Sequence, residues 1–153
     1  MISAGQTAPD FTLPRDGGAT ITLSALRPGK VVIYFYPKDD TPGCTLEAQD
    51  FNARLSEFTA AGATVIGISK DSVKSHDKFC KKHGLSIVLA SDESGTTCED
   101  YGVWLEKSMY GKTYMGIERT TVLIDGAGKV ARVWNKVSVK GHADEVLAAV
   151  KAL

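Results

Sequence analysis

One cysteine lies where an apolar run meets a helical pattern, in the segment Pro37-Lys-Asp-Asp-Thr-Pro-Gly-Cys44. The run Val31–Tyr36 precedes this segment and reads as a buried strand. Thr41 is a good N-cap and Pro42 suits the first helical position, so Cys44 should lie in the first turn of the helix. Unpaired backbone N–H groups and the positive end of the helix dipole favour a thiolate there. The segment therefore indicates a nucleophilic cysteine.

Length and composition are those of an ordinary globular chain. The 153 residues predict one domain, 1–153, and 43% hydrophobic with 24% charged residues is typical of a soluble protein. Eighteen basic and eighteen acidic residues give a net charge of zero, which points to neither nucleic acid nor an anionic membrane. With neither a signal peptide nor a transmembrane run expected, we place the chain in the cytoplasm. Three cysteines in a reducing compartment indicate buried or redox-active thiols, not a disulfide framework.

Strands and helices alternate along the chain. The predicted strands are Phe11–Leu13, Thr20–Leu23, Val31–Tyr36, Ala63–Ile68, Ile87–Leu89, Thr120–Ile124 and Val130–Trp134. The predicted helices are Thr45–Ala61, Val73–His83, Asp92–Gly102 and Ala143–Ala152. The segment Trp104–Gly116 has no clear hydrophobic periodicity and is interpreted as a loop. This order predicts an α/β fold with a central mixed sheet, helices on both faces and an N-terminal β-hairpin extension, which is the order of the thioredoxin fold.

The segment Phe35–Ala48 resembles the active-site loop of the peroxiredoxins, and most closely the bacterioferritin-comigratory-protein, or peroxiredoxin Q, subfamily. The resemblance extends to Ala8-Pro-Asp-Phe11, to Arg119–Asp125, and to Trp134 with Lys140-Gly-His142, so it covers nearly the whole chain. Its most specific part is the Pro-x-x-x-Thr-x-x-Cys pattern combined with a distant arginine before an apolar strand. The resemblance implies a thioredoxin-like peroxiredoxin domain.

The resemblance also implies roles for five residues. Cys44 matches the peroxidatic cysteine, Thr41 its hydroxyl partner, Pro37 the shielding proline and Arg119 the guanidinium partner. Glu47 matches the acidic position that helps to orient the arginine in relatives. All but Pro37 have a structural alternative: a free cysteine is commonly a small buried residue, threonine and glutamate are common at helix starts, and a lone arginine is usually solvated.

A second thiol must resolve the sulfenic acid that forms at Cys44. Many members of the subfamily carry a cysteine five residues after the first, but this chain has Gln49 there. Cys80, 36 positions after Cys44, lies in the next predicted helix, where some members resemble this chain in carrying the resolving cysteine. We favour Cys80, with Cys98 or an external thiol as alternatives. Because a disulfide requires Cα atoms within about 7 Å, we expect local unfolding of both helix ends.

A metal site is an alternative interpretation of the predicted helix that carries Cys80. His76, Cys80 and His83 share one face, but the two histidines lie about 10.5 Å apart along a helix axis, so one ion can take only a pair. We expect no metal and no cofactor.

Three functions fit the residues. The leading one is a thioredoxin-dependent thiol peroxidase that reduces hydrogen peroxide and small organic hydroperoxides and is recycled by thioredoxin or a glutaredoxin-like donor, with a monomer expected. A thiol–disulfide oxidoreductase is the second, although the chain lacks Cys-x-x-Cys. The third is a peroxide sensor that relays oxidation to a partner.

Overall fold

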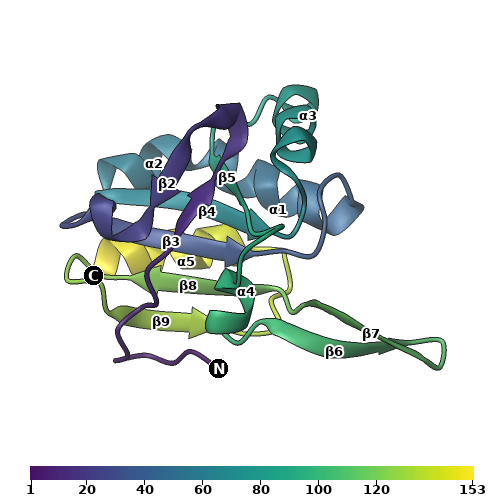
Figure 1. Ribbon diagram of the computed structural model, residues 1–153. Coiled ribbons are helices and arrows are strands. Elements are labelled where there is room, and N and C mark those ends of the chain that lie inside the picture. Colours follow the sequence, from purple (N-terminus) through teal and green to yellow (C-terminus); the bar gives the residue numbers. More distant parts are fainter.

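A five-stranded mixed sheet forms the centre of the computed structural model, which describes residues 1–153 (Figure 1). In spatial order its strands are β5 (Val88–Ser91), β4 (Ala63–Ser69), β3 (Lys30–Phe35), β8 (Thr120–Ile124) and β9 (Val130–Trp134). Strands β3, β4 and β5 are parallel, whereas β8 is antiparallel to β3 and to β9. The predicted central strand is therefore confirmed: β3 lies in the middle and is buried on both faces.

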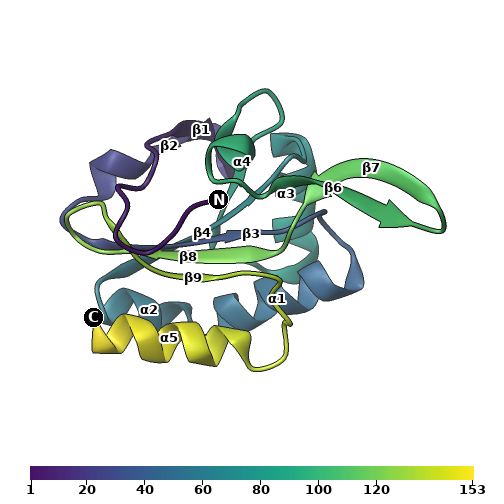
Figure 2. The same cartoon turned by 90° about the horizontal axis from the view of Figure 1, so that it is seen from below.

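Alternate side chains of β3 point into two separate cores. Val32 and Tyr34 pack with the helices α1 (Pro42–Ala53), α2 (Leu55–Ala60) and α5 (His142–Ala152). On the other face, residues of β3 pack with the N-terminal segment and with α4 (Thr97–Asp100). Figure 2 shows α1, α2 and α5 together on one side of the sheet and the N-terminal hairpin on the other.

The predicted N-terminal hairpin is present, with β1 (Thr12–Pro14) and β2 (Thr20–Thr22) antiparallel. A 3₁₀ turn, η1 (Asp16–Gly18), joins the two strands, and a second, η2 (Leu23–Leu26), follows them. Helix α3 (Val73–His83) runs beside η1 and β5 (Figure 1). No helix is both long and apolar enough to span a bilayer.

Helix α3 begins and ends where the sequence predicts. The Ser72 side chain accepts a hydrogen bond from the backbone N–H of Ser75, and Gly84 follows the helix in the left-handed conformation. The predicted helix from Asp92 is shorter, because the Asp92 carboxylate accepts the N–H groups of Thr97 and Cys98 and so precedes the helix instead of joining it.

The predicted helix Thr45–Ala61 is wrong in its continuity, since Arg54 separates α1 from α2 with φ −107° and ψ 9°. In a regular helix the Asp50 carbonyl would accept the N–H of Arg54. Here the Arg54 guanidinium takes that carbonyl at 2.8 Å, and its N–H turns to Phe51 instead.

The loop predicted for Trp104–Gly116 is also wrong. It is a hairpin of β6 (Trp104–Met109) and β7 (Lys112–Ile117) that projects from the body (Figure 1). Tyr110 and Gly111 form the turn with φ of 53° and 75°, as a two-residue type I′ turn requires. Most of its side chains are at least partly exposed, so no apolar alternation marks the strands.

Candidate active site

Cys44 is the third residue of α1, as predicted, and its side chain is a free thiol that is 2% exposed. Strand β3 ends at Phe35, and a short loop leads to Pro42, the first helical residue. The thiol therefore lies among the unpaired N–H groups of the helix start, within a nearly water-free environment. The helix-start N–H groups and the helix dipole favour a negative charge on sulfur, whereas burial by itself opposes it, so fixed donors must stabilise that charge.

Arg119 meets Cys44 because of the sheet topology. It immediately precedes β8, which pairs antiparallel with β3 so that Thr120 lies opposite Phe35. The start of β8 and the end of β3 are thus neighbours, although they are far apart in sequence. The Nη2 group of Arg119 donates to the Sγ atom of Cys44 at 3.3 Å. The predicted pair is brought together.

Glu47 holds the other side of the guanidinium. Its Oε1 atom accepts from Nη1 of Arg119 at 2.6 Å, and its side chain is 1% exposed. Burial raises the pKa of Glu47 to about 7, and the opposing effect of Arg119 does not cancel this rise. Burial alone would lower the pKa of Arg119, but Glu47 and Cys44 outweigh burial and raise it. The guanidinium is therefore a permanent charge fixed between a carboxyl group and the thiol.

Thr41 and Pro37 lie close to Cys44 in sequence, but their contacts differ from expectation. The Thr41 backbone carbonyl accepts from Thr45 N at 2.8 Å, so Thr41 starts the helix, while its side chain makes no capping bond. The Thr41 hydroxyl instead donates to the Lys38 carbonyl at 2.9 Å. That donation leaves its oxygen lone pairs free to accept from a ligand. Pro37 is exposed in the loop.

Gly43 is a site residue that the sequence argument missed. A Cβ atom at this position would lie 3.3 Å from Nη2 of Arg119, the same nitrogen that donates to Cys44. A glycine between Pro42 and Cys44 therefore lets the guanidinium approach the first turn of the helix. The Pro-Gly-Cys sequence carried this signal, because a glycine at a helix start has no propensity advantage of its own.

The two other cysteines lie on opposite faces of the sheet. Cys80, on α3, is partly buried and packs against the same core as Cys44. Burial and then the nearby carboxylates, Asp16 foremost, raise the pKa of the Cys80 thiol to about 12. Cys98, on α4, is fully buried in the other core, where burial and Asp92 raise its pKa strongly. Among these thiols, Cys80 therefore shares the side of the sheet with Cys44, and Cys98 does not.

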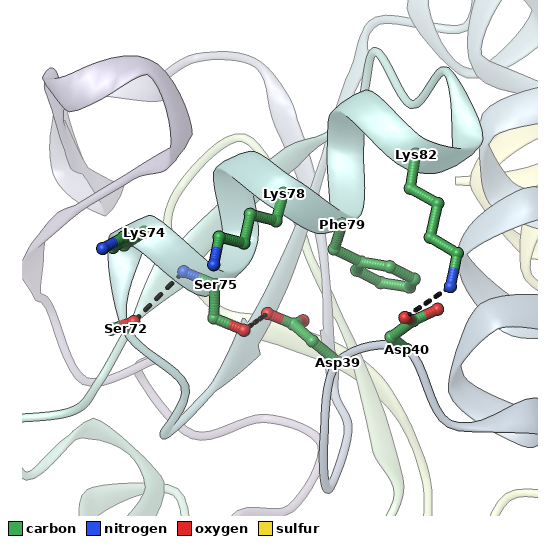
Figure 3. Close-up of a pocket in the computed structure, with 8 residues that line it drawn as sticks. All are labelled: Asp39, Asp40, Ser72, Lys74, Ser75, Lys78, Phe79 and Lys82. Atoms are coloured by element: carbon green, nitrogen blue, oxygen red, sulfur yellow. Dashed lines mark hydrogen bonds and ion pairs between the residues drawn. The ribbon is translucent and has the colours of Figure 1, made fainter.

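A hollow of about 530 Å³ lies between the active-site loop and α3 (Figure 3). Asp39 and Asp40 line it from the loop, and Lys78, Phe79 and Lys82 line it from the helix. The Cys44 thiol does not line this hollow. We therefore assign the chemistry to the Cys44–Arg119 contact and not to the hollow.

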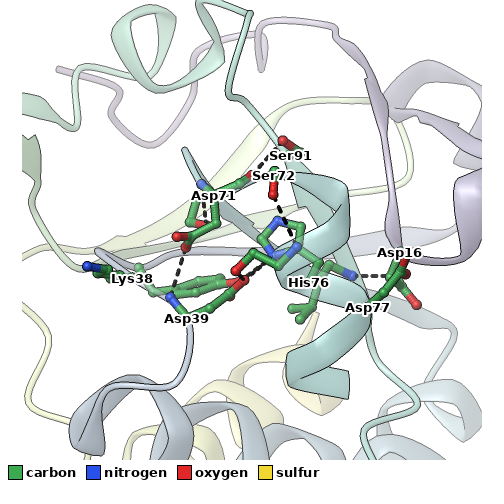
Figure 4. Close-up of polar contacts among 12 residues, drawn as sticks. Asp16, Lys38, Asp39, Asp71, Ser72, His76, Asp77 and Ser91 are labelled. Atoms are coloured by element: carbon green, nitrogen blue, oxygen red, sulfur yellow. Dashed lines mark hydrogen bonds and ion pairs between the residues drawn. The ribbon is translucent and has the colours of Figure 1, made fainter. Parts of the chain in front are cut away.

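One group of potential metal ligands, Asp39, Asp71 and His76, has its atoms within 4.8 Å of one another (Figure 4). These atoms already bind within the protein: Asp71 accepts from the Asp39 N–H at 2.8 Å, and His76 Nδ1 lies 2.7 Å from Asp39. We assign no ion to it. The helix-face grouping weighed from the sequence does not form either, because His76 is buried and His83 pairs with Asp40.

Comparison with known proteins agrees with this geometry. The family model described as the AhpC/TSA family matches residues 4–133. Peroxiredoxin Bcp of Xanthomonas campestris pv. campestris is 54% identical over 143 residues, 94% of this chain and 89% of the relative. Peroxiredoxin Bcp of Bacillus subtilis is 46% identical over 150 residues, 98% of this chain and 96% of the relative. The chain belongs to the AhpC/TSA family and is a peroxiredoxin.

The fold of this peroxiredoxin also matches solved structures. A cysteine-to-serine mutant of Xanthomonas campestris peroxiredoxin Q superposes with a TM-score of 0.92 at 50% identity, covering 99% of each chain. The predicted thioredoxin-like fold and the resemblance to the peroxiredoxin Q subfamily are thereby confirmed. The protein is accordingly an enzyme, a thiol-dependent peroxidase.

Proposed function

We propose that Cys44 is the peroxidatic cysteine. Its thiolate attacks one oxygen of a hydroperoxide, the O–O bond breaks, and the departing oxygen takes a proton to leave as an alcohol or water. Cys44 becomes a sulfenic acid, so sulfur is oxidised and the peroxide is reduced. The single observation that carries the proposal is the Arg119 donor 3.3 Å from a sulfur in the first turn of a helix.

The surrounding residues stabilise charge as it moves from sulfur to oxygen. Arg119 has several N–H donors and a permanent charge, so it can serve the thiolate first and the leaving oxygen afterwards. Glu47 orients the guanidinium through the 2.6 Å contact. Thr41, whose own O–H is donated to Lys38, accepts the peroxide O–H. Pro37 lacks an N–H group and so adds no competing donor to the loop.

Cys80 resolves the sulfenic acid in this proposal. Its thiol attacks the Cys44 sulfur, an S–S bond forms, and water leaves. One observation that supports Cys80 over Cys98 is its place in the fold: Cys80 packs in the same core as Cys44, whereas Cys98 lies in the opposite core. In addition, two cysteine-to-serine mutants of Xanthomonas campestris peroxiredoxin Q have been solved, and their substituted positions are 36 residues apart, the separation of Cys44 and Cys80.

The substrates are hydrogen peroxide and small organic hydroperoxides. A structural study of the Xanthomonas campestris bacterioferritin comigratory protein, 49% identical to this chain, concerns alkyl peroxide reduction. Thioredoxin or a glutaredoxin-like dithiol then reduces the disulfide by exchange. We expect a monomer, because both sulfurs of the proposed disulfide come from one chain, and a reducing compartment such as the cytoplasm.

A coupled assay tests these assignments. Peroxide, thioredoxin, thioredoxin reductase and NADPH are mixed with wild type or with serine variants of each cysteine. Cys44→Ser should abolish NADPH consumption, and Cys80→Ser should form sulfenic acid but no intramolecular disulfide. Cys98→Ser is the matched control and should keep turnover. Turnover retained by Cys44→Ser would refute the peroxidatic role, and a disulfide retained by Cys80→Ser would move the resolving role to Cys98.

A further inference from the structure

The buried carboxylate of Asp39 joins the active-site loop to α3. Its Oδ1 atom accepts from the Tyr36 hydroxyl at 2.5 Å. Its Oδ2 atom lies 2.8 Å from the Ser75 hydroxyl and 2.7 Å from Nδ1 of His76, both in the first turns of α3. Figures 3 and 4 show the Asp39 side chain reaching from the loop to this helix. The loop that leads to Cys44 is thus fixed to the helix that carries Cys80.

The ring of His76 must be a donor at both nitrogens. Nδ1 faces the Asp39 carboxylate, and Nε2 lies 3.0 Å from the carbonyl of Ala90 on β5, and neither of those oxygens can donate. Other titratable groups facing the ring are Tyr36, 3.4 Å from Nδ1, and Asp71 on the turn before α3. Burial would lower the pKa of His76, but Asp39 outweighs it and the pKa is raised. The geometry is that of a buried imidazolium–carboxylate pair.

A second pair links the same loop to the far end of α3, but it lies at the surface. Asp40 accepts from Lys82 at 2.8 Å and from His83 at 3.0 Å, and its side chain is 44% exposed. Exposed ion pairs contribute little, because water and salt screen them. Removing one partner of a buried, hydrogen-bonded charge pair has a much larger effect. The two neighbouring aspartates therefore predict very different effects from the same substitution.

We propose that Asp39 and His76 are positioning residues that keep α3 folded against the active-site loop and thereby set the rate at which Cys80 can reach oxidised Cys44. The proposal rests on the assignment of Cys80 as the resolving thiol. While α3 is folded, Cys80 stays a protonated thiol among carboxylates. Opening the Asp39–His76 contact releases the helix, exposes Cys80 and lets the S–S bond form.

The Asp39–His76 contact, which we call the latch, decides between two fates of the sulfenic acid. Resolution joins Cys44 to Cys80 and releases water, whereas a second hydroperoxide converts the sulfenic acid to a sulfinic acid and leaves as an alcohol. A closed latch prolongs the sulfenic state and favours overoxidation. Because the folded-state pKa of His76 is raised, the contact is complete below the ordinary histidine pKa and weakens as pH rises through the raised value. Resolution should therefore accelerate with rising pH.

The test compares Asp39→Asn with Asp40→Asn, the same change at adjacent positions of one loop. Asparagine also tolerates the positive φ of 59° at Asp40, so that control keeps its backbone. Hydrogen exchange of amides in α3, measured on the reduced protein, should rise about tenfold or more for Asp39→Asn and change little for Asp40→Asn. Rapid-quench mass spectrometry should show faster disulfide formation and less sulfinic acid for Asp39→Asn alone.

The wild type provides a test that needs no variant. Between about pH 6 and about pH 9, exchange of α3 corrected for intrinsic rates should rise, and Asp39→Asn should lose this dependence. Equal α3 exchange in the two variants, or a flat wild-type profile, would overturn the latch. The exchange measurement on reduced protein does not depend on which thiol resolves. Mapping the disulfide to another cysteine would refute the role of Cys80 and leave the exchange result to judge the latch separately.

Discussion

Replacement of Glu47 by glutamine should change how stability depends on pH. The side chain is 1% exposed, and its Oε2 atom has no hydrogen-bond partner, so ionising it inside the protein is costly. Its pKa is raised from 4.5 to about 7. A change of that size corresponds to about 3 kcal/mol of free energy between the two protonation states.

The direction of the effect follows from proton binding. Between about pH 4.5 and about pH 7 the folded protein holds a proton on Glu47 that the unfolded chain has released. Stability therefore falls as pH rises across this window, by up to about 3 kcal/mol from this residue. Glu47→Gln cannot titrate and should lack that fall, although above about pH 7, where Glu47 is ionised, the variant also loses a charge that holds Arg119.

Urea unfolding followed by the fluorescence of Trp104 and Trp134 measures the difference. Reduced wild type and Glu47→Gln are unfolded at several values between about pH 4.5 and about pH 8, and the free energies are subtracted at each pH. Subtraction removes the other titrating groups, which the two proteins share. A difference that stays constant across the window would mean that Arg119 keeps Glu47 ionised throughout, and would refute the reasoning.

Three further predictions concern neighbouring residues. In stopped-flow measurements, Arg119→Ala should lower the rate constant for oxidation of Cys44 by peroxide about 100-fold or more, because the donor to sulfur is lost. Adding Glu47→Gln to this variant should restore stability, because no unpaired buried carboxyl remains, but should not restore the rate. Gly43→Ala should displace the Arg119 guanidinium and slow peroxide reduction several-fold. The urea midpoint should not fall, because alanine favours the helix. An unchanged rate would show that the close approach of the guanidinium to residue 43 is unimportant. Burial is the main cause that lowers the pKa of His142 to about 4, so stability should fall as pH drops from about 6.5 towards about 4. His142→Gln can still form a hydrogen bond with Thr121, and urea unfolding should show a smaller fall in stability for this variant.

The central strand was predictable because burial leaves a clear pattern. The apolar run Val31–Tyr36 has no polar alternation, and only a strand covered on both faces needs that composition. The β6–β7 hairpin lacks such a pattern because water surrounds most of it, and Tyr110 is an unusual residue for the first turn position. The break at Arg54 depends on a side chain competing for a carbonyl, which helical periodicity does not record.

Some residues of the site could be predicted from the sequence, and others could not. Cys44 and Thr41 could be placed by local rules of helix starts, whereas the role of Arg119 was implied only by the resemblance to the family. The glycine in Pro-Gly-Cys was a signal for Gly43, but its partner, the Arg119 guanidinium, is identified only by the fold. The Asp39–His76 contact joins residues 37 positions apart through a buried pair, and nothing in either local sequence indicates the other. A buried polar contact of this kind can be recognised only once the fold brings its two residues together.

Opposite electrostatic surroundings give the two thiols different tasks. Cys44 faces a guanidinium and the N–H groups of a helix start, which stabilise negative charge on sulfur. Cys80 faces Asp16, Asp39 and other carboxylates, which with burial keep its proton in place. Peroxide should thus oxidise Cys44 first, since only a thiolate is strongly nucleophilic. When α3 opens, Cys80 leaves those carboxylates and gains access to water, so the motion that brings the sulfurs together also makes the second thiol reactive.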